Sequence, residues 1–106
     1  MAAALTIGKT STDEGQLTLS LTGKLDTMTS LQLEAELKKC LDTVKHLVFD
    51  FSALDYVSSA GLRVLVKAQK VMNKQGTMVV RNPNSEIYEI LDVTGLAGVL
   101  TIEADK

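Results

Sequence analysis

The first quarter of the chain carries the hydrophobic pattern of a β-hairpin. Leu17, Leu19 and Leu21 alternate with small polar residues, which is the period-two pattern of a strand with one buried face. A second β-type stretch runs from Leu5 to Lys9, and the turn residues Asp13-Glu14-Gly15 separate the two stretches. We therefore predict an N-terminal hairpin made of residues 5–9 and 16–22.

Helical spacing replaces this alternation after a loop at residues 23–26. Thr29 and Gln32, three residues apart, fit a capping box, so the helix is predicted to begin with Thr29 as its N-cap. Its apolar stripe consists of Leu33, Leu37, Cys40 and Leu41. We interpret Cys40 on this stripe as a small buried hydrophobic residue rather than as a redox group.

Strands alternate with helices in the remainder of the chain. The strand at 45–51 has a nearly continuous apolar centre, which is typical of a strand covered on both faces and places it in the middle of the sheet. The other predicted elements are a helix at 59–73 that ends at Gln75-Gly76, a strand at 77–80, a short helix capped by Asn84-Ser85 and followed by Gly95, and a strand at 99–102. This alternation implies crossover connections and an α/β fold, with a mixed sheet that is largely parallel in its second half.

The composition indicates one domain, residues 1–106, with an aliphatic core. Hydrophobic residues make up 45% of the 106 residues, yet aromatic residues make up only 4% and Trp is absent. The 11 Lys and Arg residues against 13 Asp and Glu residues give a formal net charge of −2. A balance this close to neutral argues against a general nucleic-acid-binding protein and against an electrostatic membrane anchor.

The single cysteine and the single histidine limit the chemistry of the chain. Cys40 has no second cysteine for an intramolecular disulfide, and with His46 as the only histidine a Cys-His metal cluster is excluded. We predict neither a metal nor a cofactor. The sequence shows no secretory leader and no apolar run of membrane-spanning length, so we expect a cytoplasmic protein without membrane insertion.

Two adjacent serines, Ser58 and Ser59, precede the second helical pattern. The preceding strand is predicted to end at Asp50 and a loop follows, so one serine hydroxyl is expected at the exposed N-terminus of the helix. Free N–H groups and the helix dipole at such a place favour a phosphate by about 0.3 to 1 kcal/mol. Ordinary N-capping explains the same residues. Spacing alone leaves both interpretations open.

A catalytic use of Ser59 finds little support. A serine hydrolase would need Ser59 as nucleophile and His46 as base, but Val57 occupies the position of the first glycine in a G-x-S-x-G turn, and the chain is short for such folds. The sequence contains no G-x-x-x-x-G-K-[ST] loop to hold a triphosphate. We therefore predict that the protein is not an enzyme and that ATP belongs to a partner.

A basic stripe follows along the same helix. Arg63, Lys67, Lys70 and Lys74 recur at i, i+4, i+7 and i+11, which places them on its exposed side. The stripe is either an ordinary solvated face or a docking face that meets acidic groups on a partner and steers association. Both interpretations remain open at this point.

Three segments recur together, in this order and at these separations, in one known family. They are Gly23-Lys24-Leu25-Asp26, residues Asp50 to Leu65, and Leu91-Asp92-Val93-Thr94-Gly95-Leu96. Together they resemble the STAS domain family, in particular the bacterial anti-sigma-factor antagonists, and the resemblance covers nearly the whole chain. It implies a small mixed β-sheet with helices packed mainly on one face.

The resemblance implies partner switching as the function. In its unphosphorylated form, such a protein binds an anti-sigma factor that is also a serine kinase, and the sigma factor is released for transcription. The kinase phosphorylates the antagonist on a serine at the start of the second helix, which ends the complex, and a metal-dependent Ser/Thr phosphatase restores it. The alternative is a STAS module in another assembly, such as a stress-signalling scaffold or a lipid-transport complex.

The family pattern also implies site residues. Its Gly-Leu pair matches the residues from Gly61 onward and places the phosphoacceptor at Ser59, while Ser58, at a position that is often Asp in the family, remains a competing acceptor. Asp26 matches a loop acid that the family places near the acceptor, where it contacts the partner or the nucleotide. An exposed loop acid is expected to contribute little to folding. The predicted partner-binding residues are Asp26, Ser58, Ser59, Arg63 and Lys67.

Overall fold

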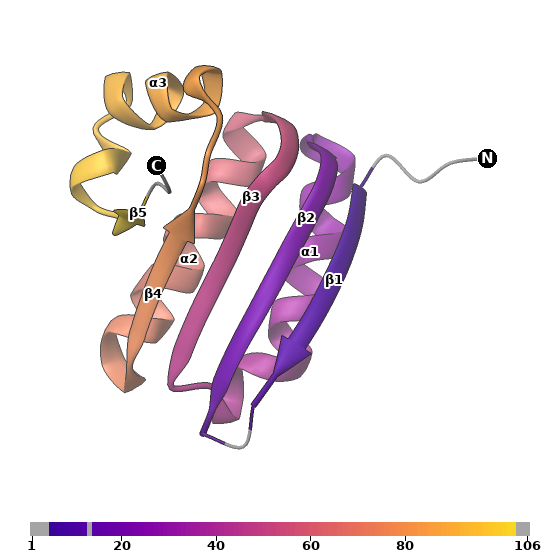
Figure 1. Ribbon diagram of the computed structural model, residues 1–106, viewed down its shortest axis with the longest axis vertical. Coiled ribbons are helices and arrows are strands. Elements are labelled where there is room, and N and C mark those ends of the chain that lie inside the picture. Colours follow the sequence, from indigo (N-terminus) through magenta and orange to yellow (C-terminus); the bar gives the residue numbers. More distant parts are fainter. Residues whose placement is uncertain (1–4, 13, 104–106) are drawn as a thin grey trace.

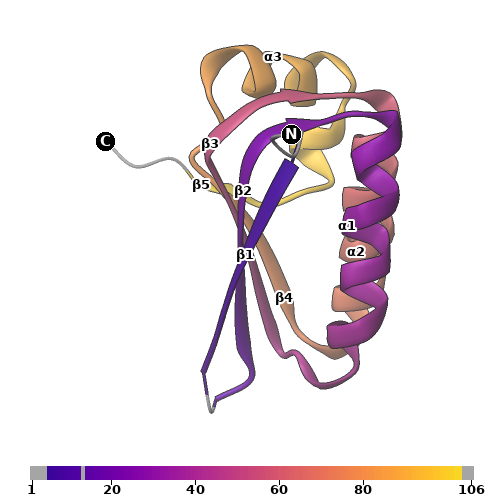
Figure 2. The same cartoon turned by 90° about the vertical axis from the view of Figure 1, so that its right-hand side faces the viewer.

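A five-stranded mixed β-sheet, with two long helices on one of its faces, forms the body of the protein (Figure 1, Figure 2). The computed structural model describes residues 5–12 and 14–103. Its elements are β1 (Leu5–Ser11), β2 (Gln16–Leu25), α1 (Thr27–Cys40), the 3₁₀ turn η1 (Leu41–Thr43), β3 (His46–Val57), α2 (Ser59–Gln75), β4 (Thr77–Arg81), α3 (Ser85–Val93), the 3₁₀ turn η2 (Leu96–Gly98) and β5 (Ile102–Glu103). Within these described residues, no helix is both long and apolar enough to cross a membrane.

The strands follow one another across the sheet in the order β1-β2-β3-β4-β5. β1 and β2 form the predicted hairpin and are antiparallel, while every later pair of neighbours is parallel. Right-handed crossovers that all step in the same direction leave their helices on the same face, which is why α1 and α2 lie side by side there (Figure 2). The predicted mixed sheet with helices mainly on one face is therefore confirmed, and α3 lies at one end of the sheet (Figure 1).

The core between the sheet and the two helices is aliphatic, as the composition predicts. Its aromatic members are Phe49 and Phe51, whose ring centroids lie 6.1 Å apart. Both belong to β3 and face the core, whereas Val48 between β2 and β4 is buried on the opposite face of the sheet. Burial on both faces confirms β3 as the middle strand.

The predicted start of the first helix is wrong by three residues. β2 continues through the expected loop to Leu25, and Asp26 rather than Thr29 is the N-cap. The Asp26 carboxylate accepts hydrogen bonds from the backbone N–H groups of Met28, at 3.0 Å, and Thr29, at 2.9 Å. The Thr29 hydroxyl accepts in return from the Asp26 N–H at 2.8 Å, so the capping box exists with Thr29 at its third helical position.

Two strand predictions also need correction. The strand expected to end at Asp50 runs on to Val57, because the stretch predicted as a loop pairs with β2 through two register irregularities. Each irregularity inserts one extra residue, so the buried positions Phe51, Leu54 and Val57 are three apart instead of two and do not resemble a strand pattern. The strand predicted at 99–102 is only the short β5 (Ile102–Glu103).

The remaining helix boundaries follow the predictions closely. The helix predicted at 59–73 is α2, which ends at Gln75 with Gly76 as its C-cap. The helix α3 begins after Asn84, whose side chain accepts a hydrogen bond from the Ile87 N–H at 2.8 Å. Ordinary capping residues therefore set both ends of the crossover helices.

Candidate functional site

The N-termini of α1 and α2 lie side by side at one end of the sheet (Figure 1). Both helices follow the carboxyl ends of neighbouring parallel strands, so their first turns emerge at the same edge. The backbone N–H of Ser58 donates to the carbonyl oxygen of Leu25 at 2.8 Å, and this hydrogen bond joins the two helix starts. Asp26 and Ser59 each follow one of the joined residues, so the structure brings these two predicted site residues together.

Gly61 allows this close approach. A Cβ atom at this position would lie 2.8 Å from Cγ of Leu25, closer than real Cβ contacts permit, and 3.0 Å from Cγ2 of Val57, which is a tight contact. The first turn of α2 therefore rests directly on the ends of β2 and β3. The absence of a side chain at Gly61 sets the position of Ser59 relative to Asp26.

The two serines have different environments. Ser58 is the N-cap of α2, it is half-buried, and its Oγ accepts a hydrogen bond from the Gly61 N–H at 3.2 Å. Ser59 is the first residue of the helix, its side chain is exposed, and among the described residues its hydroxyl has no hydrogen-bond partner. The Ser59 hydroxyl is accessible to a macromolecule, while the Ser58 hydroxyl is engaged in the cap.

Asp26 has a structural role that the sequence analysis missed. Its carboxylate caps α1, and the hydrogen bond from the Thr29 N–H is the largest cause that holds the pKa of Asp26 below its ordinary value. The Thr29 hydroxyl, the Met28 N–H and the charge of Lys24 act in the same direction. Asp26 is therefore an ionised cap next to Ser59 and not the exposed loop acid expected from the sequence. Because its oxygen satisfies two backbone donors, we expect it to contribute to folding.

Substitution of Asp26 tests this cap. Asp26→Ala is expected to lower the melting temperature by about 5 °C at neutral pH, because the backbone donors of the first turn of α1 lose their acceptor. Asp26→Asn is the matched control, since asparagine caps helices as well as aspartate does but carries no charge. Equal melting temperatures for wild type and Asp26→Ala in thermal denaturation would contradict the cap.

The lowered pKa also predicts an acid-dependent loss of stability. A carboxylate whose pKa is depressed in the folded state stabilises that state fully at pH values above its ordinary pKa. This contribution disappears as the pH falls through the pKa of the folded state. We expect wild type to lose more stability than Asp26→Asn between neutral pH and about pH 3. Urea unfolding at both pH values measures the difference, and parallel losses in the two proteins would be the contrary result.

The basic stripe on α2 is exposed as predicted, but its members are not equivalent. Lys67 forms an ion pair with Glu34 of α1, with 3.1 Å between Nζ and Oε2. Across residues 5–12 and 14–103, Arg63, Lys70 and Lys74 have no ion-pair partner. Arg63 lies one helical turn from Ser59 and is the nearest of the four along the helix. A docking role therefore fits the unpaired Arg63 better than Lys67.

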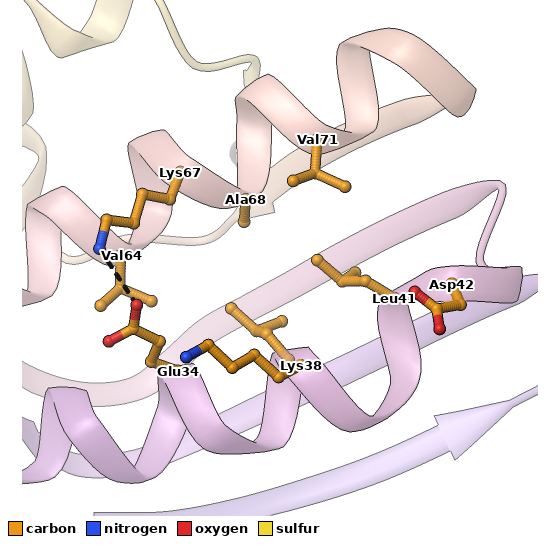
Figure 3. A pocket seen from close by; sticks show the side chains of 9 residues that line it. Glu34, Lys38, Leu41, Asp42, Val64, Lys67, Ala68 and Val71 are labelled. Atoms are coloured by element: carbon orange, nitrogen blue, oxygen red, sulfur yellow. Dashed lines mark hydrogen bonds and ion pairs between the residues drawn. The ribbon is translucent and has the colours of Figure 1, made fainter.

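A groove of about 330 Å³ lies between α1 and α2 (Figure 3). Its floor is apolar and includes Leu41, Val64 and Ala68, and the ion pair between Glu34 and Lys67 crosses it. The groove contains neither of the two serines nor Asp26. It is therefore separate from the edge where α1 and α2 begin.

His46 and Ser59 lie at opposite ends of β3. His46 is the first residue of this strand and Ser59 follows its end, and a strand of 12 residues spans roughly 35 Å. The His46 ring contacts the Thr77 hydroxyl at 2.8 Å instead. The two residues therefore cannot act as base and nucleophile of one hydrolase site. In the part of the chain that the structure describes, no three His, Cys, Asp or Glu residues form a group able to hold a metal ion.

Cys40 packs only partly against the core. It is half-buried at the end of α1, and its thiol donates to the carbonyl oxygen of Glu36 at 2.9 Å. Burial raises the pKa of the Cys40 thiol, and this keeps the less reactive protonated form. The position fits a small packing residue, although one less buried than the sequence predicts.

Fold and site together define a small α/β domain with an exposed serine at the head of a helix. Comparison with known proteins identifies the particular family: the chain belongs to the STAS domain family, whose family model matches residues 9–106. The match covers the end of β1, the strands β2 to β5 and all three helices. The resemblance inferred from the three sequence segments is therefore confirmed.

Relatives and solved structures that are similar to this chain are named anti-sigma factor antagonists. The chain is 33% identical over 91 residues to BtrV of Bordetella bronchiseptica, which bears that name, and the match covers 84% of this chain and 78% of BtrV. A crystal structure of an anti-sigma factor antagonist from Mycobacterium paratuberculosis superposes with a TM-score of 0.84 at 24% identity, over 93% of this chain and 85% of that one.

The anti-sigma factor antagonist SpoIIAA has been solved in two forms. Its unphosphorylated form matches with a TM-score of 0.76 at 14% identity, over 95% of this chain and 89% of that one. Its phosphorylated form, from Bacillus, matches with a TM-score of 0.75 at 17% identity, over 95% and 93%. At these identities the likeness shows the fold, and the fold is common to both forms.

Proposed function

We propose that this protein is an anti-sigma factor antagonist whose phosphorylation state switches its partner. Its unphosphorylated form binds an anti-sigma factor with serine kinase activity, and the sigma factor is set free. The names of its relatives support this function. The observation that carries the switch is the exposed hydroxyl of Ser59. It lies near Asp26, because the hydrogen bond between Ser58 and Leu25 joins the residues that precede Ser59 and Asp26.

The chain supplies the acceptor and the partner supplies the chemistry. Ser59 Oγ attacks the γ-phosphorus of ATP held by the kinase, the bond to ADP breaks, and the hydroxyl proton passes to a base of the kinase. A metal-dependent Ser/Thr phosphatase removes the phosphate and restores the binding form. The protein itself then acts in the cytoplasm, where the sigma factor works, and needs neither a metal nor a nucleotide of its own.

Electrostatics explains why phosphorylation would end the complex. A phosphoserine adds about −1.5 to −2 charges, and at Ser59 this charge would lie beside the ionised Asp26. Burying it against a partner surface without a matched cation costs several kcal/mol. SpoIIAA has nearly the same TM-score to this chain in its two forms, 0.76 and 0.75, which supports a switch that needs no refolding.

Phosphate transfer to Ser59 is the direct test. After incubation with ATP and the cognate anti-sigma factor kinase, mass spectrometry of the peptide from Asp50 to Arg63 is expected to place one phosphate on Ser59. Ser59→Ala should abolish the modification, while Ser58→Ala should retain it, because the Ser58 hydroxyl is engaged with Gly61. Phosphate on Ser58 alone would overturn the assignment of the acceptor.

A further inference from the structure

Two large apolar side chains of α1 stand exposed near Ser59. The side chains of Met28 and Leu31 are 75% and 62% exposed, respectively. They are three residues apart in the helix, so they lie on one side of α1, away from the core stripe that begins with Leu33. Adjacent exposed apolar side chains of this size on a small domain often mark a surface that a partner covers.

The hydrogen bond between the two helix starts fixes where this pair lies. Ser58 donates to the carbonyl of Leu25. Met28 follows Leu25 by three residues, so the Cα atoms of Leu25 and Met28 are at most about 11 Å apart. Leu31 lies about 4.5 Å further along the axis of α1. The pair therefore borders the edge that carries Ser59, on the α1 side.

We infer that Met28 and Leu31 form the apolar anchor by which the partner kinase holds this protein, an inference that rests on the proposed function. A kinase that reaches the Ser59 hydroxyl must cover the surface around it. A standard interface covers about 800 Å² on each partner, equivalent to a disc of roughly 16 Å radius. Centred on Ser59, such a disc includes the first turns of α1, so the partner presents an apolar hollow beside its phosphate-transfer site.

The anchor and the acceptor have separate tasks. Methionine and leucine carry no charge, so the anchor supplies affinity through apolar burial, while Ser59 supplies the group whose charge changes. Contacts at the anchor are the same before and during phosphate transfer. Their loss should therefore raise the dissociation constant and the KM for this protein as a kinase substrate, with kcat unchanged.

Glutamine substitutions test the anchor, because glutamine is close in size to methionine and leucine but ends in a polar amide. Met28→Gln and Leu31→Gln are each expected to weaken binding to the cognate anti-sigma factor kinase by about tenfold, with melting temperatures within about 1 °C of wild type since both side chains are exposed. Val71→Gln is the matched control: Val71 is 41% exposed and lies on α2 three turns beyond Ser59, about 18 Å along the helix axis. Titration calorimetry gives the affinities, and steady-state phosphorylation with ATP gives KM and kcat.

The outcomes separate this inference from the proposed function. If the double variant Met28→Gln/Leu31→Gln binds within twofold of wild type, or if Val71→Gln weakens binding as much as either single variant, the anchor is wrong although the proposed function stands. A lowered kcat with unchanged KM also overturns the anchor, because it marks a contact made only during transfer. If wild type neither binds the kinase nor accepts phosphate from it, the proposed function itself fails.

Discussion

Ser59→Asp is expected to weaken the complex with the anti-sigma factor by at least about a hundredfold, whereas Ser59→Ala keeps the affinity of wild type. The aspartate places a negative charge beside the ionised Asp26, at an exposed helix start that the partner must cover. Desolvation of an unmatched charge costs several kcal/mol, and each 1.4 kcal/mol corresponds to about tenfold in affinity. Titration calorimetry with the purified anti-sigma factor measures the change.

Ser11→Asp is the control for charge alone. It makes the same substitution on an exposed serine, but Ser11 ends β1 near the hairpin turn, at the opposite end of the sheet from Ser59 (Figure 1). Its affinity should equal that of wild type. A similar loss in Ser11→Asp and Ser59→Asp would show that net charge, and not its position, governs binding, and would contradict a local switch.

Gly61→Ala is expected to lower the free energy of unfolding by about 1 to 2 kcal/mol. The new methyl group would lie 2.8 Å from Cγ of Leu25, and overpacking of this kind costs about 1 to 3 kcal/mol. The higher helix propensity of alanine offsets up to about 1 kcal/mol of this cost. The strain moves the first turn of α2 away from β2, so phosphorylation of Ser59 should also slow about tenfold or more.

Two further variants isolate the contact between Gly61 and Leu25. Gly98→Ala adds a methyl group where no atom lies within 4 Å, so its unfolding free energy should stay within about 0.5 kcal/mol of wild type. In a Leu25→Ala background, where the nearest atoms are absent, Gly61→Ala should cost much less than it does alone. Urea unfolding of wild type, the two single variants at Gly61 and Leu25 and the double variant gives the coupling free energy between the two residues. Strictly additive losses of unfolding free energy would disprove the contact.

The elements that the pattern predicted well are those whose signals are local. The alternation around Leu19 predicts β2, and helical spacing with a capping residue predicts α2 and α3, because each signal needs only neighbouring residues. The extension of β3 to Val57 escaped prediction since two irregularities in its pairing with β2 change the spacing of buried residues. Pairing between distant strands decides this spacing, and one strand read alone does not contain it.

The candidate site, too, could be predicted only in part from the sequence. Ser59 and Asp26 could be named from the resemblance to the family, but the residues alone did not distinguish Ser58 from Ser59. The hydrogen bond from the Gly61 N–H to Ser58 makes that distinction, and it exists only in the folded cap. The capping role of Asp26 could have been found from the sequence, because Asp26 precedes Thr29 by three residues and aspartate is among the preferred N-caps.

The proposed docking surface was the least predictable part of the site. Met28 lies just before the apolar stripe of α1 and is exposed. The hydrophobic pattern of the helix does not show which of its apolar residues remain outside the core. The ion pair between Lys67 and Glu34 was equally hidden, because it depends on how α1 packs against α2. Both features arise from tertiary packing, and both change which side chains are free to meet a partner.

We propose above that phosphorylation of Ser59 ends a complex with an anti-sigma factor. The most direct measurement compares two dissociation constants for the same purified anti-sigma factor, one for the unphosphorylated protein and one for the protein carrying phosphate on Ser59. The phosphorylated protein is expected to bind at least about a hundredfold more weakly. Equal dissociation constants, or tighter binding by the phosphorylated protein, would contradict the proposal.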